Sequence, residues 1–166
     1  MTEITRHFTA TTFIVHQDKV LLHDHPKQHL WLPPGGHIER DELPHDAAVR
    51  EVEEETGLRV QLHSATEARE LAELMDCAVV PQPAFILIET INPFHEHVDF
   101  TYFARCDKPA MEDGATDQPV WRRNAFSWFT AEELTMENVP ANVRQAARLA
   151  IDYFASTPPD AACNNT

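Results

Sequence analysis

The chain contains little glycine, little cysteine and no long apolar run. Four of its 166 residues are glycine, whereas 43% are hydrophobic. That composition argues against a fibrous or disordered class, and the length suits one domain with a core of its own. The cysteines, Cys77, Cys106 and Cys163, are odd in number and widely spaced. Such a set favours reduced thiols in a cytosol over a disulfide framework.

Segments that would carry the chain into or across a membrane are also missing. No stretch reaches the roughly 18 apolar residues that a membrane-spanning helix needs. The N-terminus from Met1 to His7 lacks the basic and apolar regions of a signal peptide. We therefore expect a cytoplasmic protein with no membrane partner.

Basic residues are scarce. Lysine and arginine number 13 against 27 acidic residues, which gives a formal net charge of −14. A net-acidic surface repels the phosphate backbone of DNA and RNA, which argues against a nucleic-acid partner. A small polyanionic substrate would meet the same repulsion and would need a metal ion to overcome it.

Glutamates gather on one short segment. Glu51, Glu54 and Glu55 have the spacing i, i+3 and i+4, which places them on one face of a helix. Like charges this close are destabilising unless something neutralises them. The simplest neutraliser is a hard divalent cation, because such ions prefer carboxylate oxygens. Since a Pro-Pro-Gly-Gly turn at 33–36 lies nearby, the pattern indicates Mg²⁺ held for chemistry on phosphates.

The same segment resembles the Nudix box. That pattern is Gly, five residues, Glu, seven residues, Arg-Glu, an aliphatic, any residue, Glu-Glu, any residue, Gly and an aliphatic. Its specified positions are filled by Gly36, Glu42, Arg50, Glu51, Val52, Glu54, Glu55, Gly57 and Leu58. Nine fixed positions over 23 residues outweigh the alternative of a solvated helix face. Glu53 stands at an unspecified position, and we expect it on the surface.

The resemblance implies an α/β (α+β) fold, an α/β/α sandwich in which a mixed β-sheet lies between helices. Hydrophobic patterns place strands at 8–15, 19–23, 60–63, 84–91, 97–105 and 125–129, and helices at 44–56, after Thr130 and at 143–154. A helical or irregular excursion is expected at 66–76. We expect a single Nudix domain over residues 1–156 and a disordered tail over 157–166.

The sequence predicts both ends of the glutamate helix and its buried side. Pro44 suits its first turn and Gly57 its C-terminal cap. Leu43 offers no hydroxyl cap, so Asp41 is the candidate substitute. The buried stripe is predicted from Ala48, Val49 and Val52.

The resemblance also implies a site. Its metal ligands are Glu51, Glu54, Glu55 and the backbone carbonyl of Gly36, and the cation is Mg²⁺, with Mn²⁺ as a substitute. The catalytic set is Glu54, Glu51 and Arg50. In this set Arg50 acts as an organiser that pairs along the helix or reaches back to Glu42. Gly36 and His37 are the substrate-binding candidates.

The general base stays open. It is Glu51 or Glu54 within the box, or an acid further along the chain. The downstream candidates are Glu96, Asp99, Glu112, Asp113 and Asp117. The last three occupy a predicted loop, where catalytic residues are often found.

Histidines and aromatic residues admit two interpretations each. His23 with His25, and His95 with His97, have the i, i+2 spacing that places both rings on one strand face. With Asp99 the second pair is a candidate Zn²⁺ site, although a polar strand face lining a pocket is the stronger interpretation. Four aromatic residues are predicted as core more readily than as base-stacking groups: Trp31, Phe85, Tyr102 and Phe103.

The leading hypothesis is a Mg²⁺-dependent pyrophosphohydrolase. It cleaves a phosphoanhydride bond of a nucleoside triphosphate, or of a nucleoside diphosphate linked to another group. None of the subfamily marks outside the box is present, so the substrate is unspecified. A non-catalytic nucleotide sensor of the same fold is the alternative, and a zinc protein built on His95, His97 and Asp99 is a third. The sequence leaves open whether the protein forms a homodimer.

Overall fold

The computed structural model describes residues 3–26, 28–63, 75–106 and 126–157. Its strands are β1 Thr5–His16, β2 Lys19–Asp24, β3 Trp31–Leu32, β4 Gly35–His37, β5 Gln61–His63, β6 Phe85–Asn92, β7 His95–Arg105 and β8 Phe126–Thr130. Its helices are α1 Pro44–Thr56, α3 Ala141–Ser156 and the short 3₁₀ helix η2 Glu133–Thr135. The predicted strands and both predicted long helices are present, with ends shifted by a few residues.

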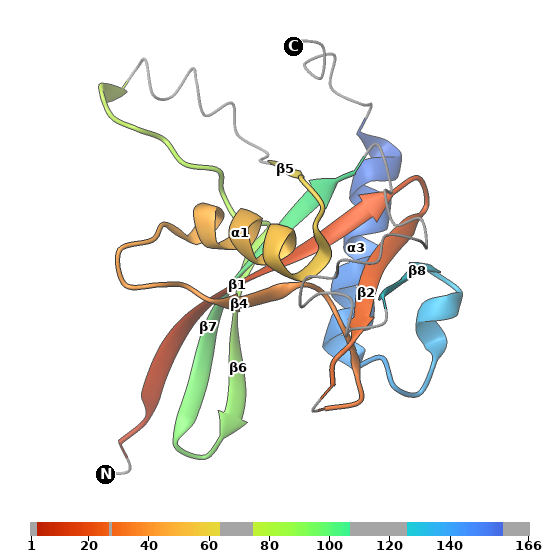
Figure 1. Ribbon diagram of the computed structural model, residues 1–166, viewed down its shortest axis with the longest axis horizontal. Coiled ribbons are helices and arrows are strands. Elements are labelled where there is room, and N and C mark those ends of the chain that lie inside the picture. The colour runs from red at the N-terminus through yellow and green to blue at the C-terminus, as the bar shows by residue number, and fades with distance from the viewer. Residues whose placement is uncertain (1–2, 27, 64–74, 107–125, 158–166) are drawn as a thin grey trace.

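The strands form one mixed sheet. β1 pairs in parallel with β7 over eleven residue pairs, from Thr5↔His95 to Val15↔Arg105, whereas the other strand pairs are antiparallel. Figure 1 shows α1 in front of this sheet and α3 behind it. The predicted sandwich of a mixed sheet between helices is therefore confirmed.

The alternating side chains of β1 explain why one helix packs on each face of the sheet. Phe13 and Val15 of β1 belong to a buried cluster with Val143 and Ile151 of α3. Ile14, on the opposite side of β1, packs in a cluster with Val52 of α1. Because successive strand residues point to opposite faces, β1 serves both helices and fixes α1 relative to the sheet.

The glutamate helix begins and ends where the sequence predicts. Gly57 adopts φ 70°, and its N–H donates to the carbonyl of Glu53, so it forms a left-handed C-terminal cap. At the N-terminus, Leu43 provides no side-chain cap, and Asp41 does not replace it. The predicted buried stripe is partly wrong, because Val49 is only half-buried while Ala47 and Thr56 join Ala48 and Val52 in the buried set.

The predicted Pro-Pro-Gly-Gly turn is also partly wrong. Gly35 and Gly36 lie within β4, paired with Thr11 and Ala10 of β1. A Cβ at Gly35 would lie 2.6 Å from the carbonyl oxygen of Ala10, and a Cβ at Gly36 would overlap the carboxylate of Glu51. Close packing, rather than a bend, requires glycine here.

The helix predicted after Thr130 begins with a capping box, but it is only one turn long. The N–H of Thr130 donates to Oε2 of Glu133 at 2.9 Å, and the N–H of Glu133 donates to Oγ1 of Thr130 at 3.4 Å. The helix that follows is η2 alone.

Some predictions fall on other parts of the chain. Residues 66–74 of the expected excursion, the acids Glu112, Asp113 and Asp117, Cys163 and the tail from 158 onward lie outside the described residues. Among the helices that the structure does describe, none has the length and apolar character to span a membrane.

Candidate active site

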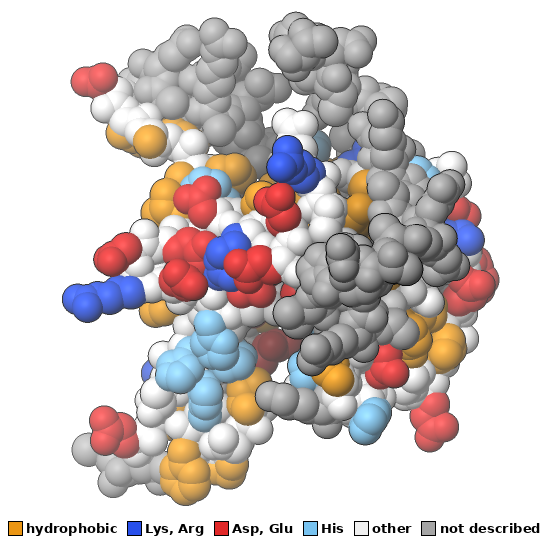
Figure 2. Space-filling view, in the orientation of Figure 1, with side chains coloured by type: hydrophobic (Ala, Val, Ile, Leu, Met, Phe, Trp, Pro, Cys, Tyr) orange, Lys and Arg blue, Asp and Glu red, His pale blue; other side chains and the backbone are white. Residues whose placement is uncertain are grey.

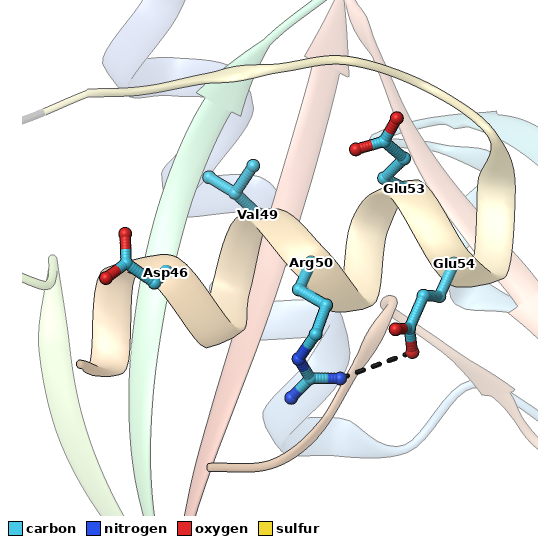
Figure 3. Close-up of a pocket in the computed structure, with 5 residues that line it drawn as sticks. All are labelled: Asp46, Val49, Arg50, Glu53 and Glu54. Carbon is cyan, nitrogen blue, oxygen red and sulfur yellow. Dashed lines mark hydrogen bonds and ion pairs between the residues drawn. The ribbon is translucent and has the colours of Figure 1, made fainter. Parts of the chain in front are cut away.

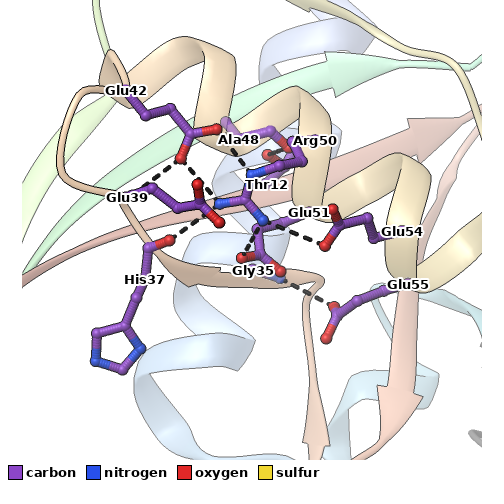
Figure 4. Close-up of polar contacts among 10 residues, drawn as sticks. All are labelled: Thr12, Gly35, His37, Glu39, Glu42, Ala48, Arg50, Glu51, Glu54 and Glu55. Atoms are coloured by element: carbon purple, nitrogen blue, oxygen red, sulfur yellow. Dashed lines mark hydrogen bonds and ion pairs between the residues drawn. The ribbon is translucent and has the colours of Figure 1, made fainter.

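Arg50 is the centre of a hydrogen-bond network on α1 (Figure 4). Its Nε and Nη2 donate to the two oxygens of Glu42 at 2.7 and 2.9 Å. Nη1 donates to Glu51 at 2.8 Å and to Glu54 at 3.2 Å, and Nη2 also donates to the carbonyl of His37 at 3.1 Å. One guanidinium thus ties α1 to the preceding loop and to β4, as the organiser role predicts.

This network sets the charges of its members. The hydrogen bond from Arg50 lowers the pKa of Glu42, and the same bond raises the pKa of Arg50 further above its usual range. Glu42 also accepts the N–H of Glu39 at 3.0 Å, which closes the loop before α1. Glu42 is therefore the predicted support for the loop, held as a carboxylate by Arg50.

The three glutamates differ in their surroundings. The Glu51 side chain is 15% exposed and lies against Gly36, whereas the Glu54 side chain is 61% exposed. Glu55 accepts the N–H of Gly35 at 3.1 Å. The pKa of Glu55 is raised to about 7, mainly by burial and also by the negative charges of Glu51 and Glu54, while the Gly35 hydrogen bond opposes the shift.

Burial is the main cause of the raised pKa of Glu55, and the negative charges of Glu51 and Glu54 add to it. Arg50 compensates Glu42 and contacts Glu51 and Glu54, whereas Glu55 forms no ion pair within the described residues and accepts the N–H of Gly35. A hard divalent cation would supply compensating positive charge, and the carboxylate oxygens of the glutamates are the ligands that such an ion prefers.

A different group of side chains has its ligand atoms close together. Within the described residues, His7, His37 and His97 have ligand atoms that lie within 4.8 Å of one another, whereas the glutamates do not form such a group.

Glu53 points away from this set, although it lines a shallow hollow on α1 together with Arg50 and Glu54 (Figure 3). Figure 3 shows Glu54 pointing to the same side as Arg50, whereas Glu53 points away from both. Glu53 forms its ion pair with Arg59, at 3.4 Å, on the surface. Its predicted place outside the site agrees with this geometry.

A larger cleft of about 630 Å³ begins at β4 and Glu55. Its near wall contains Gly35, Gly36, His37 and Glu55, and its far wall comes from β6 and α3. Further lining residues include His23, His25, Leu87, Ile88, Glu89, His97, Asp99, Asn142 and Val143. Both predicted substrate-binding residues, Gly36 and His37, therefore border a space large enough for a nucleotide-sized ligand.

The downstream acids that the structure describes are already engaged. Asp99 is buried and accepts hydroxyl hydrogen bonds from Thr9, Thr11 and Thr101 at 2.8, 2.7 and 2.6 Å. Glu96 pairs with Arg6 at 2.9 Å. Both carboxylates are therefore already hydrogen-bonded or ion-paired, and among the described residues the predicted zinc set of His95, His97 and Asp99 does not gather as a metal-ligand group.

Sequence reasoning missed Glu89, an acid in the cleft. Burial raises its pKa, Asp99 raises it further, and a hydrogen bond from Asn142 at 3.2 Å opposes both. A single glutamate inside the apolar run 84–91 was the signal that could have pointed to it. A carboxyl group with a raised pKa in a cleft is a candidate for acid or base work.

Histidines on the two sides of the cleft have different environments. His23 is buried and stacks on Phe126, and burial together with His25 lowers its pKa to about 4. His97 has its pKa lowered by burial and by His37, among other neighbouring histidines. Burial therefore disfavours the protonated form of both rings.

The four aromatic residues serve as core, which is the interpretation favoured from the sequence. Tyr102 and Phe103 are buried. Trp31 and Phe85 are partly buried and pack against the cluster on the α3 side of the sheet.

Comparison with known proteins gives a consistent result. A model of the NUDIX domain family matches residues 5–153. The structure is similar to the crystal structure of a hydrolase of the NUDIX family from Clostridium perfringens, with a TM-score of 0.74 and 34% identity, covering 90% of this chain and 99% of that one.

Two curated proteins resemble shorter parts of the chain. A probable DHNTP pyrophosphohydrolase from Lactococcus lactis subsp. cremoris is 32% identical over 105 residues, which are 63% of this chain and 57% of that protein. The m7GpppN-mRNA hydrolase NUDT17 of Xenopus laevis is 56% identical over 32 residues, which are 19% of this chain and 11% of that protein. The chain thus spans about half or less of the length of either curated relative.

Proposed function

The chain belongs to the NUDIX domain family, as the glutamate pattern predicts, and we propose that it is a Mg²⁺-dependent pyrophosphohydrolase. Nudix hydrolases act on phosphoanhydride bonds of small nucleotide derivatives, and the family generally uses divalent metal ions. For this chain the proposed substrate is a nucleoside triphosphate, or a nucleoside diphosphate linked to another group.

One observation carries this proposal. Glu51, Glu54 and Glu55 share one side of α1 with a single arginine that contacts two of them, Glu55 lines the cleft, and burial helps raise the pKa of Glu55 to about 7. A surface helix with no ligand would not gain from this arrangement, because like charges so close together are destabilising. A cation shared with substrate phosphates resolves the repulsion.

The residues divide the work as follows. Glu51, Glu54, Glu55 and the Gly36 carbonyl would hold Mg²⁺, with Mn²⁺ as a substitute. Such an ion neutralises the substrate phosphates and stabilises the leaving group. Gly36 leaves room for the Glu51 carboxylate against the backbone of β4, since any Cβ there would overlap it.

Arg50 and Glu54 complete the chemistry. Arg50 orients Glu51 and Glu54 through one nitrogen, and through Glu42 it fixes the loop that precedes α1. Glu54 is the most exposed carboxylate of this network, so a water molecule can reach it and lose its proton there. His37 and Gly36 border the cleft where the phosphates would lie.

The cleft also suggests which substrates to test first. Apolar side chains such as Leu32, Leu87 and Val143 line it together with Asn142 and Gln28, which suits a flat heterocycle with polar edges. The resemblance to a probable DHNTP pyrophosphohydrolase adds dihydroneopterin triphosphate to the nucleotides as a candidate.

The test is a panel of nucleoside di- and triphosphates, nucleotide-linked diphosphates and dihydroneopterin triphosphate, incubated with Mg²⁺ or Mn²⁺. Chromatography resolves the products, and ¹⁸O-labelled water shows which phosphorus is attacked. We expect pyrophosphate or a monophosphate product that appears only with the metal. Tight nucleotide binding by calorimetry, with no product from any member of the panel, would instead identify a sensor.

A further inference from the structure

A second group of ligand-type side chains lies on the other side of β4. His7 of β1, His37 of β4 and His95 and His97 of β7 come together from three strands. Strand register explains this gathering, because His7 pairs with His97, and His37 pairs with Thr9, two residues along β1 from His7. Figure 2 shows a patch of histidine side chains directly beside the charged side chains that lie over α1.

The distances suit a single ion. The ligand nitrogens of His7, His37 and His97 all lie within 4.8 Å of one another, and Nδ1 of His7 is 3.3 Å from Nε2 of His37. Around a tetrahedral Zn²⁺ with bonds of about 2.0–2.1 Å, ligand nitrogens lie roughly 3.4 Å apart. Small rotations of exposed imidazole rings would therefore close the set around a metal.

His95 supplies an independent observation. Its Nε2 is buried, and no hydrogen-bond partner for it is found in the described part of the chain. Its ring centroid lies 4.5 Å from that of His7 and 4.9 Å from that of His97. An unsatisfied buried nitrogen is costly, and an ion or a metal-bound water beside the other three rings would satisfy it.

The neighbouring acids do not belong to this group. Both oxygens of Asp99 accept threonine hydroxyls, and Glu96 pairs with Arg6. The donor set is therefore nitrogen only, unlike the oxygen set on α1. Imidazole nitrogen suits Zn²⁺, Cu²⁺ or Ni²⁺, whereas Mg²⁺ prefers oxygen.

We propose that His7, His37 and His97 bind a transition-metal ion of the Zn²⁺ type, at a site separate from the glutamates. Three protein ligands leave one tetrahedral position open. His37 and His97 also line the cleft, so that position is accessible to a water molecule or to an oxygen of a molecule in the cleft. The ion would lie one residue along β4 from Gly36, which contacts Glu51.

Calorimetric titration with Zn²⁺, in excess Mg²⁺, tests this site in the 166-residue chain without a polyhistidine tag. We expect one equivalent of Zn²⁺ to bind, and Co²⁺ to give the visible absorption of a tetrahedral nitrogen-coordinated ion. His97→Asn and, separately, His37→Asn should weaken binding by at least about tenfold. His29→Asn is the matched control, since His29 is exposed, lies outside the cluster and has a positive φ of 53° that asparagine tolerates.

Three results would overturn the proposal: no Zn²⁺ binding in excess Mg²⁺, equal binding by wild type and both cluster variants, or loss of binding in Glu51→Gln but not in His97→Asn. Circular dichroism identifies any variant that fails to fold, and His7→Asn then replaces it. Because the readout is metal binding, a failure of this site is distinguishable from a failure of the proposed hydrolase activity.

Discussion

The two sides of β4 carry different chemistry, and the chain builds them in different ways. On one side Gly36 lies against Glu51, and Arg50 holds Glu51 and Glu54. On the other side His37 contacts His7. Neighbouring residues of a strand point in opposite directions, so one short strand can separate an oxygen site from a nitrogen site.

Origin in the sequence distinguishes them further. The oxygen site comes from one helix and the segment just before it, within 23 residues. The nitrogen site comes from β1, β4 and β7, whose paired histidines His7 and His97 are ninety positions apart. The local site can be read from spacing, whereas the dispersed site exists only once the strands have paired.

Removing one charge from the oxygen site should give the largest effect. In Glu54→Gln we expect kcat to fall by about 10²–10⁴-fold, because the variant loses a carboxylate that can bind the ion or accept the proton. Steady-state kinetics measure this, while circular dichroism checks the fold. Zn²⁺ binding by the histidines should be unchanged, and a variant that keeps more than about a tenth of wild-type turnover would remove Glu54 from the essential residues.

The two glycines of β4 separate site geometry from fold stability. In Gly36→Ala the new Cβ displaces the flexible Glu51 carboxylate, and we expect Mn²⁺ affinity to fall by about 10–100-fold. In Gly35→Ala the new Cβ meets the backbone of Ala10 and Thr11, and overpacking there should cost about 1–3 kcal/mol of unfolding free energy. Metal titration and urea unfolding of both variants measure the metal affinity and the unfolding free energy. Equal losses of both quantities in the two variants would contradict the separate roles of Gly36 and Gly35.

The pH should affect both the stability of the metal-free protein and the metal affinity of the oxygen site, because Glu55 gains or loses a proton. Its pKa is raised from 4.5 to about 7 in the folded, metal-free protein, so the folded state holds more protons than the unfolded state between these pH values. Stability of the metal-free protein should therefore fall as pH rises through this window. Below about pH 7, Mn²⁺ affinity should decrease by roughly tenfold per pH unit, because the ion displaces one proton.

Calorimetry and thermal unfolding between about pH 5 and about pH 8 follow both trends. Glu55→Gln is the control, and it should flatten both curves. If wild type and Glu55→Gln show the same pH dependence, the titration belongs to another group.

Glu53 should give the smallest effect, although it stands among the site glutamates. Its partner is Arg59 on the surface, and it points away from Arg50 (Figure 3). Glu53→Gln should leave kcat/KM within about twofold of wild type, since exposed pairs contribute little. A loss as large as that of Glu54→Gln would mean that the whole glutamate face acts as one unit.

Spacing along the sequence predicted the helix Pro44–Thr56, its Gly57 cap and the surroundings of Arg50. These features depend on residues within a few turns of one another. The role of Gly35 and Gly36 was misread, because a glycine pair indicates a bend and a close contact equally well, and only the neighbouring chain decides between them.

The histidine group and the role of Glu89 depend on contacts between distant parts of the sequence, so the sequence did not predict them. Nothing near His97 in the sequence points to His7 or His37, and the i, i+2 pattern suggested Asp99 instead. Asp99 lies on the correct strand face, but three threonine hydroxyls already occupy it. Glu89 was missed for a similar reason, since its cleft is completed by Asn142 of α3.

The parallel pairing of β1 with β7 has a consequence for folding. Eleven residue pairs join segments ninety positions apart, so the loop between them must close before the pairing can stabilise anything. Contacts of such high sequence separation slow folding. During synthesis β1, α1 and β4 emerge well before β7, and β1 keeps an unpaired edge until β7 arrives. The histidine group can therefore assemble only after β7 has been synthesised and has paired with β1, whereas the glutamate helix can form earlier.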